Sequence, residues 1–421
     1  MKGFSAACAA AMLAAVAVAG CGGDDSRTAS AEGGSGGGTL TVHSSLPLQG
    51  ASKNQAQAIT NGMKLALDQA GGKVGDYTIK YVSLDDSTAQ AGAWTPEATS
   101  ANARKAAQDD STIAYLGEFN SGASAVSMPI LNETGVPQNE LTNTAVGLTS
   151  DAPGSEPGEP DKYYPSGERH YVRIVPKDDI QGAALVTMMK QDGCENVFMT
   201  NDKEVFGAGL ARNIEITAKD QGVSVIANEG IDKNAANYRS LASSAASKDA
   251  DCMVYAGITA NNAVQLFKDF SAALPDGRLY GPDGIAESGF ADPEEGGIPA
   301  DVGSKVKVSI AVLPPESYPA EGQTFFEDYE AAYDDKSPDP YAIYGYEAMS
   351  LTLDAIKRAA AEGKVDKAAV TEQLFATKDR ASALGTYSID EDGDTTLTDY
   401  GSYAIKGGQL VFDETIKAQA E

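Results

Sequence analysis

The sequence predicts an α/β protein in which parallel β-sheets are flanked by helices. From Thr39 onward, short apolar stretches with the character of strands alternate with longer amphipathic stretches with the character of helices. This alternation is typical of right-handed βαβ units, which build parallel sheets. Residues 39–421 are too many for one ordinary hydrophobic core, so we expect two domains.

The apolar patterns place the expected elements along the chain. Short apolar runs predict strands at 40–46, 77–84, 112–116, 136–140, 171–175, 196–200, 223–228, 252–256, 278–280 and 306–312. Apolar residues at helical spacing predict helices at 55–69, 96–108, 121–134, 180–191, 207–221, 238–247, 260–273, 325–333 and 342–361. The stretch from Lys177 to about Lys305 repeats the architecture of the preceding residues.

Two polar segments interrupt this alternation. Residues 151–167 are rich in proline, glycine and acids, which is typical of a surface loop. Residues 390–394 form an acidic run whose Gly393 is the fourth residue, whereas an EF-hand calcium loop needs glycine at its sixth position. We therefore expect this run to be the turn of a hairpin between 387–389 and 403–405 rather than a calcium site.

The N-terminus has the pattern of a lipoprotein signal. Lys2 precedes an apolar stretch over 4–18, and small residues then lead to Cys21. The stretch is too short to span a membrane, and small residues before a cysteine suit cleavage and lipid attachment. We predict a signal peptide over 1–20, a lipid on Cys21, a flexible linker over 21–38, and a location on the outer face of the cell membrane.

Charge and residue types exclude several function classes. The net charge of −28 argues against nucleic-acid binding, because phosphates require a basic surface. The chain has two histidines, His43 and His170, and neither has the neighbours of a zinc site or a catalytic triad. A Walker A loop and a dinucleotide-binding glycine pattern are missing. We therefore expect no enzymatic activity, no cofactor and no metal.

Two cysteines remain in the predicted folded region. Cys194 and Cys252 each lie beside an apolar strand pattern, so adjacent parallel strands would bring them together. Outside the cytoplasm such a pair can oxidise. We predict a disulfide between them; two buried free thiols are the alternative.

Two turns at strand ends are candidates for ligand contacts. Ser121 and Gly122 follow the strand 112–116 and open a helix, whose free N–H groups suit a carboxylate, although Ser121 could simply cap that helix. Asp283 follows the strand 278–280 in a Pro-Asp-Gly turn, where it could meet a cation or simply make the turn. Together the two turns would suit a zwitterion such as an amino acid.

The chain resembles the type I solute-binding proteins of ABC transporters, in the branch that binds leucine, isoleucine and valine. The resemblance covers nearly all of residues 39–421, and its strongest parts are 117–124, 135–149, 201–207 and 281–284. It implies that Ser121 and Thr144 bind a ligand carboxylate, and that the carbonyl of Thr142 and the side chain of Asp283 bind the ammonium group. It also implies an aromatic lining from Phe119, Phe206 and Tyr341.

The resemblance further implies two Rossmann-like lobes joined by three hinge crossings. These are expected near 171–177, 308–314 and 383–386, so that the N-terminal lobe comprises 39–172 plus 314–383 and the C-terminal lobe 173–313 plus 384–421. The chain departs from the family pattern at Glu140, at Ile258, in the loop 49–55, which has no aromatic residue, and at Asp283, which is shorter than the glutamate of some members.

The function that follows is a receptor rather than a catalyst. We expect a monomeric lipoprotein that captures a branched-chain or other neutral amino acid and delivers it to the permease of an ABC transporter. Two alternatives remain open at this point. The same fold could bind an amide, urea or an aromatic acid, or it could report a ligand to a sensory partner.

Overall fold

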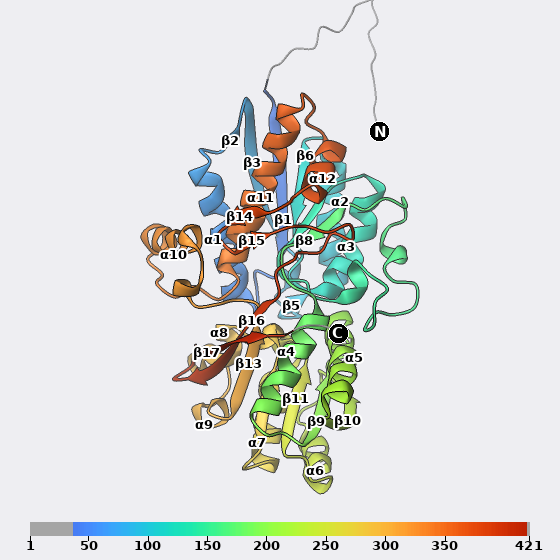
Figure 1. The fold of residues 1–421 in the computed structure, drawn as a ribbon, viewed down its shortest axis with the longest axis vertical. Helices are drawn as coiled ribbons and strands as arrows, with labels where there is room; N and C mark the ends of the chain where they lie inside the picture. Colours follow the sequence, from blue (N-terminus) through green and yellow to red (C-terminus); the bar gives the residue numbers. More distant parts are fainter. Residues whose placement is uncertain (1–36, 419–421) are drawn as a thin grey trace, which may run out of the picture. The chain divides into compact units, whose positions relative to one another are not determined.

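A computed structural model describes residues 37–418 (Figure 1). The predicted signal peptide, the lipid site Cys21 and most of the predicted linker lie outside the described residues. No helix within residues 37–418 is long and apolar enough to span a membrane.

The first lobe is built on a six-stranded sheet with the order β2-β3-β1-β6-β7-β8. All its neighbours pair in parallel except β2 and β3. The strands are β1 (Thr39–Leu46), β2 (Lys73–Val74), β3 (Tyr77–Asp85), β6 (Thr112–Leu116), β7 (Gln138–Glu140) and β8 (Tyr171–Arg173). A separate hairpin joins β4 (Ser87–Thr88) to β5 (Ala93–Trp94).

The second lobe is built on a seven-stranded sheet with the order β10-β9-β11-β12-β13-β16-β17. Pairing is parallel from β10 to β13 and antiparallel for β16 and β17. The strands are β9 (Asn196–Asn201), β10 (Ser224–Gly230), β11 (Cys252–Ala256), β12 (Arg278–Gly281), β13 (Val306–Ile310), β16 (Asp399–Lys406) and β17 (Gln409–Lys417). The predicted fold class is therefore confirmed.

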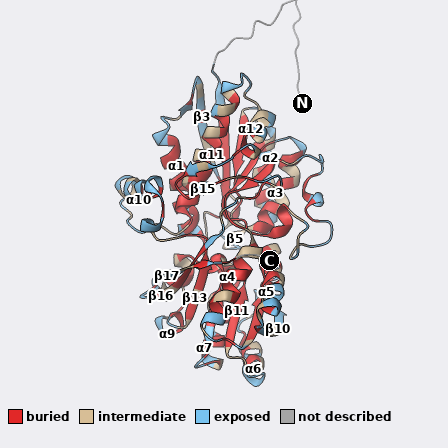
Figure 2. Ribbon diagram, in the orientation of Figure 1, coloured by how far each residue is buried: buried red, intermediate tan, exposed pale blue. Residues whose placement is uncertain are grey.

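Helices flank both sheets, and the strands between them are mostly buried (Figure 2). Those of the first lobe are α1 (Lys53–Gln69), α2 (Pro96–Gln108), α3 (Ser121–Glu133), α10 (Ala320–Tyr333), α11 (Ala342–Ala361) and α12 (Lys367–Phe375). Those of the second are α4 (Asp178–Gln191), α5 (Val205–Gln221), α6 (Arg239–Ser247), α7 (Ala263–Ala273), α8 (Ser288–Ala291) and α9 (Ala300–Gly303). The remaining short 3-10 turns are η1 (Val146–Leu148), η2 (Asp161–Tyr163), η3 (Thr259–Asn261), η4 (Asp283–Ile285), η5 (Pro293–Glu295) and η6 (Pro315–Ser317).

Helices α1 and α11 pack side by side although they are far apart in the sequence. Their backbones approach closely through two glycines. A Cβ at Gly62 would lie 2.2 Å from the carbonyl oxygen of Ala342, and a Cβ at Gly345 would lie 2.3 Å from that of Ile59. The C-terminal helices therefore complete the first lobe.

The acidic run 390–394 is a turn, as expected, but the expected pairing of 387–389 with 403–405 is wrong. Tyr387 belongs to β15 (Gly385–Tyr387), which pairs with β14 (Arg380–Ser382), and Tyr403 pairs with Val308 of β13. The acidic run is a tight turn closed by a single bridge between Ile389 and Thr395. Turn residues indicate where the chain reverses direction, but strand pairing depends on contacts with segments that are distant in the sequence. Residues 388–398 connect β15 to β16 of the seven-stranded sheet.

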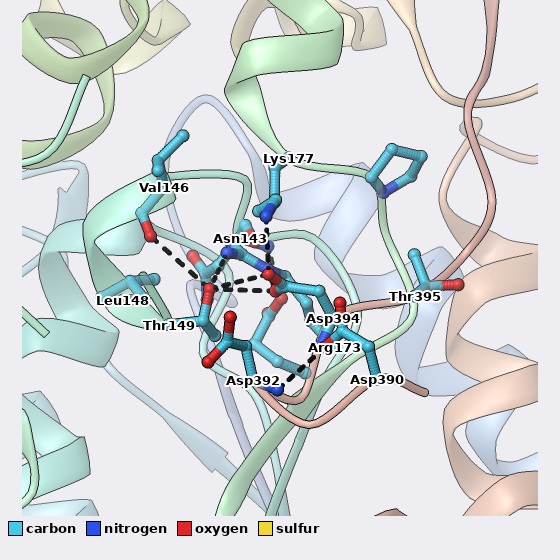
Figure 3. Close-up of polar contacts among 12 residues, drawn as sticks. Asn143, Val146, Leu148, Thr149, Arg173, Lys177, Asp390, Asp392, Asp394 and Thr395 are labelled. Carbon is cyan, nitrogen blue, oxygen red and sulfur yellow. Dashed lines mark hydrogen bonds and ion pairs between the residues drawn. The ribbon is translucent and has the colours of Figure 1, made fainter. Parts of the chain in front are cut away.

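The acidic turn has a structural role at the hinge (Figure 3). Asp394 accepts a hydrogen bond of 2.6 Å from Nε of Arg173 and lies 2.9 Å from Nζ of Lys177. Thr149 also donates to Asp394, at 2.9 Å. Arg173 and Lys177 lie in the first expected hinge crossing, so this cluster ties the connection between β15 and β16 to it.

A disulfide joins Cys194 to Cys252 within the second lobe, with Cα atoms 5.8 Å apart. Cys252 begins β11, which lies beside β9 in the sheet, and Cys194 lies just before β9. This is the pairing expected from the positions of the two strand patterns.

Candidate functional site

A small cavity lies between the two lobes, beyond the carboxyl ends of their strands. Six of the eight predicted ligand residues line it, together with Asn120, Ile258 and Gly284; the six are Phe119, Ser121, Thr142, Phe206, Asp283 and Tyr341. The other two, Gly122 and Thr144, belong to the same two turns but do not line the cavity. The carboxyl ends of parallel strands are where ligands collect in open sheets.

The first turn connects β6 to α3. Ser121 is the first residue of α3, and its hydroxyl accepts a hydrogen bond of 3.4 Å from the backbone N–H of Ala145. The helix cap is Asn120, so Ser121 does not cap its own helix. Gly122 packs against the indole of Trp94. The start of α3 thus brings Asn120 and Ser121 to the cavity, while the N–H groups of Ala123 and Ser124 bond the carbonyl of Asn120.

The second turn follows β7 and is shaped by Glu140. The buried carboxylate of Glu140 accepts hydrogen bonds from the backbone N–H groups of Thr142, at 2.9 Å, and Asn143, at 2.5 Å. Burial raises the pKa of Glu140 to about 7, against the opposing effect of these hydrogen bonds. Glu140, which departs from the family pattern, therefore stabilises the turn through hydrogen bonds to its backbone.

Arg173 holds the same turn from the hinge side. Its Nη1 donates to the carbonyl oxygens of Asn143, at 3.0 Å, and Ala145, at 2.9 Å. These two residues flank Thr144, whose buried hydroxyl has no hydrogen-bond partner among the described residues. Thr142 has a separate contact, because its hydroxyl donates a hydrogen bond of 3.0 Å to the carbonyl oxygen of Phe119. The hinge cluster and the second turn therefore form one connected network.

Asp283 brings a buried carboxylate to the cavity from the second lobe. It lies in η4, directly after β12. Its Oδ2 accepts a hydrogen bond of 2.7 Å from the hydroxyl of Tyr341, whereas Oδ1 has no partner among the described residues. Burial raises the pKa of Asp283 to about 6.

Asp178, at the start of α4, is a second buried acid that the sequence analysis missed. Both of its carboxylate oxygens lack hydrogen-bond partners among the described residues. Burial, followed by the nearby charge of Asp283, raises the pKa of Asp178 well above its ordinary value. An acid in the first turn of a helix is usually a solvated partner of the helix dipole, so the sequence alone gave no reason to select it.

Apolar side chains form the rest of the wall. Phe206 lies in the first turn of α5, Tyr341 directly precedes α11, and Phe119 stands beside Ser121. Ile258 occupies a position where the family often has an aromatic residue, and it also lines the cavity. A Cβ at Gly284 would lie 2.9 Å from Cε1 of Phe206, so the wall is closely packed there.

Sequence comparison assigns the chain to a family. A sequence model described as "Periplasmic binding protein" matches residues 39–409. The chain belongs to the periplasmic binding protein family. Members of this family bind solutes and are not enzymes.

Individual relatives of this periplasmic binding protein are distant in sequence, and they cover between about half and nine-tenths of the chain. The Leu/Ile/Val-binding protein BraC3 of Rhizobium johnstonii is 22% identical over 383 residues, covering 89% of this chain and 94% of the relative. A leucine-, isoleucine-, valine-, threonine- and alanine-binding protein of Pseudomonas aeruginosa is 24% identical, covering 56% of this chain and 60% of the relative.

Solved structures show the same two-lobed fold. The leucine-binding protein LivK of Thermotoga maritima has a TM-score of 0.76 at 21% identity, covering 90% of this chain and 98% of LivK. A solute-binding protein from R. palustris in complex with benzoate has a TM-score of 0.73 at 22% identity, covering 91% and 98%. Proteins of this fold therefore carry ligands with and without an amino group.

The histidines and the candidate metal ligands lie away from the cavity within residues 37–418. His170 is buried, and its Nδ1 accepts a hydrogen bond of 2.9 Å from Asn132. His43 contacts Thr112, and neither histidine lines the cavity. The single cluster of potential metal ligands in these residues is Cys194, Cys252 and Asp251, and both of its sulfurs are used in the disulfide.

Proposed function

We propose that this protein is an extracytoplasmic receptor that captures a neutral amino acid and delivers it to the permease of an ABC transporter. One observation carries the choice of ligand class. Asp283 lines the cavity and Asp178 is buried behind the lining; three of their four carboxylate oxygens lack hydrogen-bond partners within residues 37–418. An ammonium group would supply the missing positive charge and hydrogen-bond donors.

The first lobe offers the complementary site for a carboxylate. The start of α3 provides the hydroxyl of Ser121 at the cavity, and the second turn adds the lining residue Thr142 and, behind the lining, the unpartnered hydroxyl of Thr144. Charge-assisted hydrogen bonds contribute about 1.5 to 3 kcal/mol each, so a few of them support micromolar binding. An α-amino acid carries both charged groups at the spacing of one carbon atom.

The wall around the side chain favours a neutral ligand. Phe119, Phe206, Ile258 and Tyr341 line the cavity, and Asp283 is its one charged lining residue. The names of the Rhizobium and Pseudomonas relatives, which bind leucine, isoleucine and valine, support a branched-chain amino acid. An aromatic acid such as benzoate fits less well, because it would leave both buried acids without a counter-charge.

Calorimetry with three ligands that differ by one charged group tests this proposal. L-leucine has both groups, 4-methylpentanoate lacks the ammonium group, and 3-methylbutylamine lacks the carboxylate. We expect L-leucine to bind and the two analogues to bind at least about tenfold more weakly, since each leaves buried groups unpaired. Benzoate, acetamide and urea complete the panel. If 4-methylpentanoate or benzoate binds as tightly as L-leucine, the amino-acid assignment is wrong.

Two variants locate the ammonium site. Asp283→Asn and Asp178→Asn should each weaken L-leucine binding by at least about tenfold, because a neutral amide cannot replace the counter-charge. Asp179→Asn is the matched control, since this neighbouring acid in the same helical turn accepts a hydrogen bond from the N–H of Ile180, whereas both carboxylate oxygens of Asp178 are buried without partners within residues 37–418. Equal affinity in all three variants would contradict the placement of the ammonium group.

The membrane-related parts of the proposal require cell experiments. We expect Cys21→Ser to release the protein from the membrane, because the lipid would be its anchor. A deletion strain should lose uptake of radiolabelled leucine if the protein serves a permease. Normal uptake combined with a lost transcriptional response to leucine would instead support a sensory role.

A further inference from the structure

The loop that interrupts the sequence pattern, residues 151–167, is here called the strap. Its C-terminal half is built into the first lobe, where Tyr163 and Tyr164 are buried. The hydroxyl of Tyr164 donates a hydrogen bond of 2.9 Å to the carbonyl oxygen of Leu148. The backbone N–H of Ser166 donates a hydrogen bond of 2.8 Å to Oδ1 of Asn132. The strap is therefore fixed at its base.

Glu159 forms hydrogen bonds that stabilise the strap. Its carboxylate accepts hydrogen bonds from the hydroxyl of Tyr163, at 2.7 Å, and from the backbone N–H of Glu156, at 2.6 Å. The carboxylate lies against Gly147, where a Cβ would stand only 1.8 Å from Oε2. The conformation of the strap is thus fixed by bonds within the strap and by its contact with Gly147.

The tip of the strap contacts the second lobe at helix α5. Nε of Arg212 donates a hydrogen bond of 2.9 Å to the carbonyl oxygen of Gly154. Nη1 of the same side chain forms an ion pair of 2.5 Å with Oε1 of Glu156. Gly154 also meets Asn213 at a point where a Cβ would be 2.4 Å from Nδ2, and its φ of +101° favours glycine. Arg212 of the second lobe therefore binds both the carbonyl group of Gly154 and the carboxylate of Glu156.

This contact lies close to the ligand cavity. A separate cavity of about 190 Å³ between the strap and α5 is lined by Val146, Gly147 and Val205. Val146 and Gly147 follow the turn that carries Thr144, and Val205 precedes Phe206. Movement of α5 away from the strap would therefore also separate the two walls of the ligand site.

We propose that the strap is a clasp between the lobes, which favours the closed arrangement even before a ligand binds and slows its opening. Separation of the lobes would break the bonds between Arg212 and the strap. The side chains of Arg212 and Glu156 are 32% and 53% exposed, so salt should weaken the clasp. This proposal does not depend on which ligand the cavity binds.

Small-angle X-ray scattering without ligand tests the clasp. Arg212→Gln should shift the protein to a larger radius of gyration, and the double variant Glu156→Arg with Arg212→Glu should restore part of the difference, because it rebuilds the ion pair but not the bond to the carbonyl of Gly154. The parent should itself expand between about 0.1 M and about 1 M NaCl, because the screening length falls from ~10 Å to ~3 Å. Arg212→Gln should show a smaller salt effect.

Arg358→Gln is the matched control. Arg358 is 29% exposed and pairs with Asp354 within α11, so it lies inside one lobe. Its loss should leave the radius of gyration unchanged. In stopped-flow experiments, L-leucine should leave Arg212→Gln about two- to fivefold faster than the parent, as expected for one partly exposed ion pair. Identical scattering and salt dependence in the parent and Arg212→Gln would overturn the clasp, whatever the ligand proves to be.

Discussion

The hydroxyl of Tyr341 donates a hydrogen bond of 2.7 Å to Oδ2 of Asp283 and joins the two lobes within the ligand cavity. Tyr341 is held by α11 of the first lobe, and Asp283 follows β12 of the second. The bond orients the carboxylate and leaves Oδ1 free for a ligand. Closing the lobes and preparing the ammonium site are therefore coupled through one side-chain pair.

Removing this hydroxyl should weaken ligand binding. In Tyr341→Phe the second oxygen of Asp283 loses its donor in a buried position, which costs about 1 to 3 kcal/mol, or about 5- to 150-fold in affinity for L-leucine. Isothermal titration calorimetry measures the change. Tyr346→Phe is the control, because its hydroxyl bonds Gln69 on the first lobe. Equal losses in the two variants would show that the effect is not specific to Asp283.

Ligand binding should release protons near neutral pH. The pKa values of Asp283 and Asp178 are raised by burial, that of Asp283 to about 6, whereas an ammonium ligand requires the ionised carboxylates. Affinity for L-leucine should therefore rise between about pH 5 and about pH 8, as the acids lose their protons in the free protein.

Calorimetry in two buffers measures this release directly. The binding enthalpy should be more exothermic in Tris than in phosphate, because Tris takes up the released proton with more heat. Asp178→Asn should reduce the difference between the buffers. A binding enthalpy independent of the buffer, together with a flat pH profile, would contradict the raised pKa values.

The hinge cluster should contribute strongly to stability. Asp394→Asn leaves the fully buried Arg173 without its counter-charge, and the free energy of unfolding should fall by about 3 to 5 kcal/mol. Asp392→Asn affects an exposed pair with Arg169 in the same turn and should cost less than about 1 kcal/mol. Denaturant unfolding followed by circular dichroism compares them, and similar losses would refute the special role of Asp394.

The same cluster gives an expected acid sensitivity. Burial would raise the pKa of Asp394, but Arg173 and Lys177 hold it below its ordinary value. The native state therefore binds this proton less readily than the unfolded state. Its stabilising contribution is complete above the unfolded pKa and is lost as the pH falls through the lower native value. Unfolding of Asp394→Asn should accordingly depend less on pH in the acid range.

The disulfide should stabilise the second lobe mainly by restricting the unfolded chain. Cys194 and Cys252 close a loop with a sequence separation of 58 residues. Loop-closure entropy for this length corresponds to about 4 kcal/mol. The double variant Cys194→Ser with Cys252→Ser should unfold at correspondingly lower denaturant concentration than the oxidised parent. Equal midpoints for the two proteins would exclude a stabilising bond.

Sequence patterns predicted the elements with a clear apolar face. The helix 342–361 coincides with α11, because its buried residues recur at helical spacing along its whole length. Strand β17 was missed, since it is the edge strand of its sheet and most of its residues are not buried. The pairing partners of Tyr387 and Tyr403 could not be predicted either, because pairing depends on contacts between distant segments.

The candidate site was predictable to the extent that its residues lie in recognisable turns. Ser121 and Asp283 follow strands directly, and both line the cavity. Asp178 was missed because its burial depends on the packing of α4 against the second sheet, which local sequence does not reveal. The lobe boundaries, the lipid on Cys21 and the roles of the lining residues stay predictions.

The packing of α1 against α11 has a consequence for the order in which the chain can fold during synthesis. Strands β9 to β13 are supplied by the continuous stretch 196–310, whereas the first lobe needs a helix that ends at Ala361. The part of the α1 surface around Ile59, which packs against Gly345, remains uncovered until that helix has been made. We therefore expect the parallel core of the second lobe to form before the first lobe is complete, although the first lobe begins the chain.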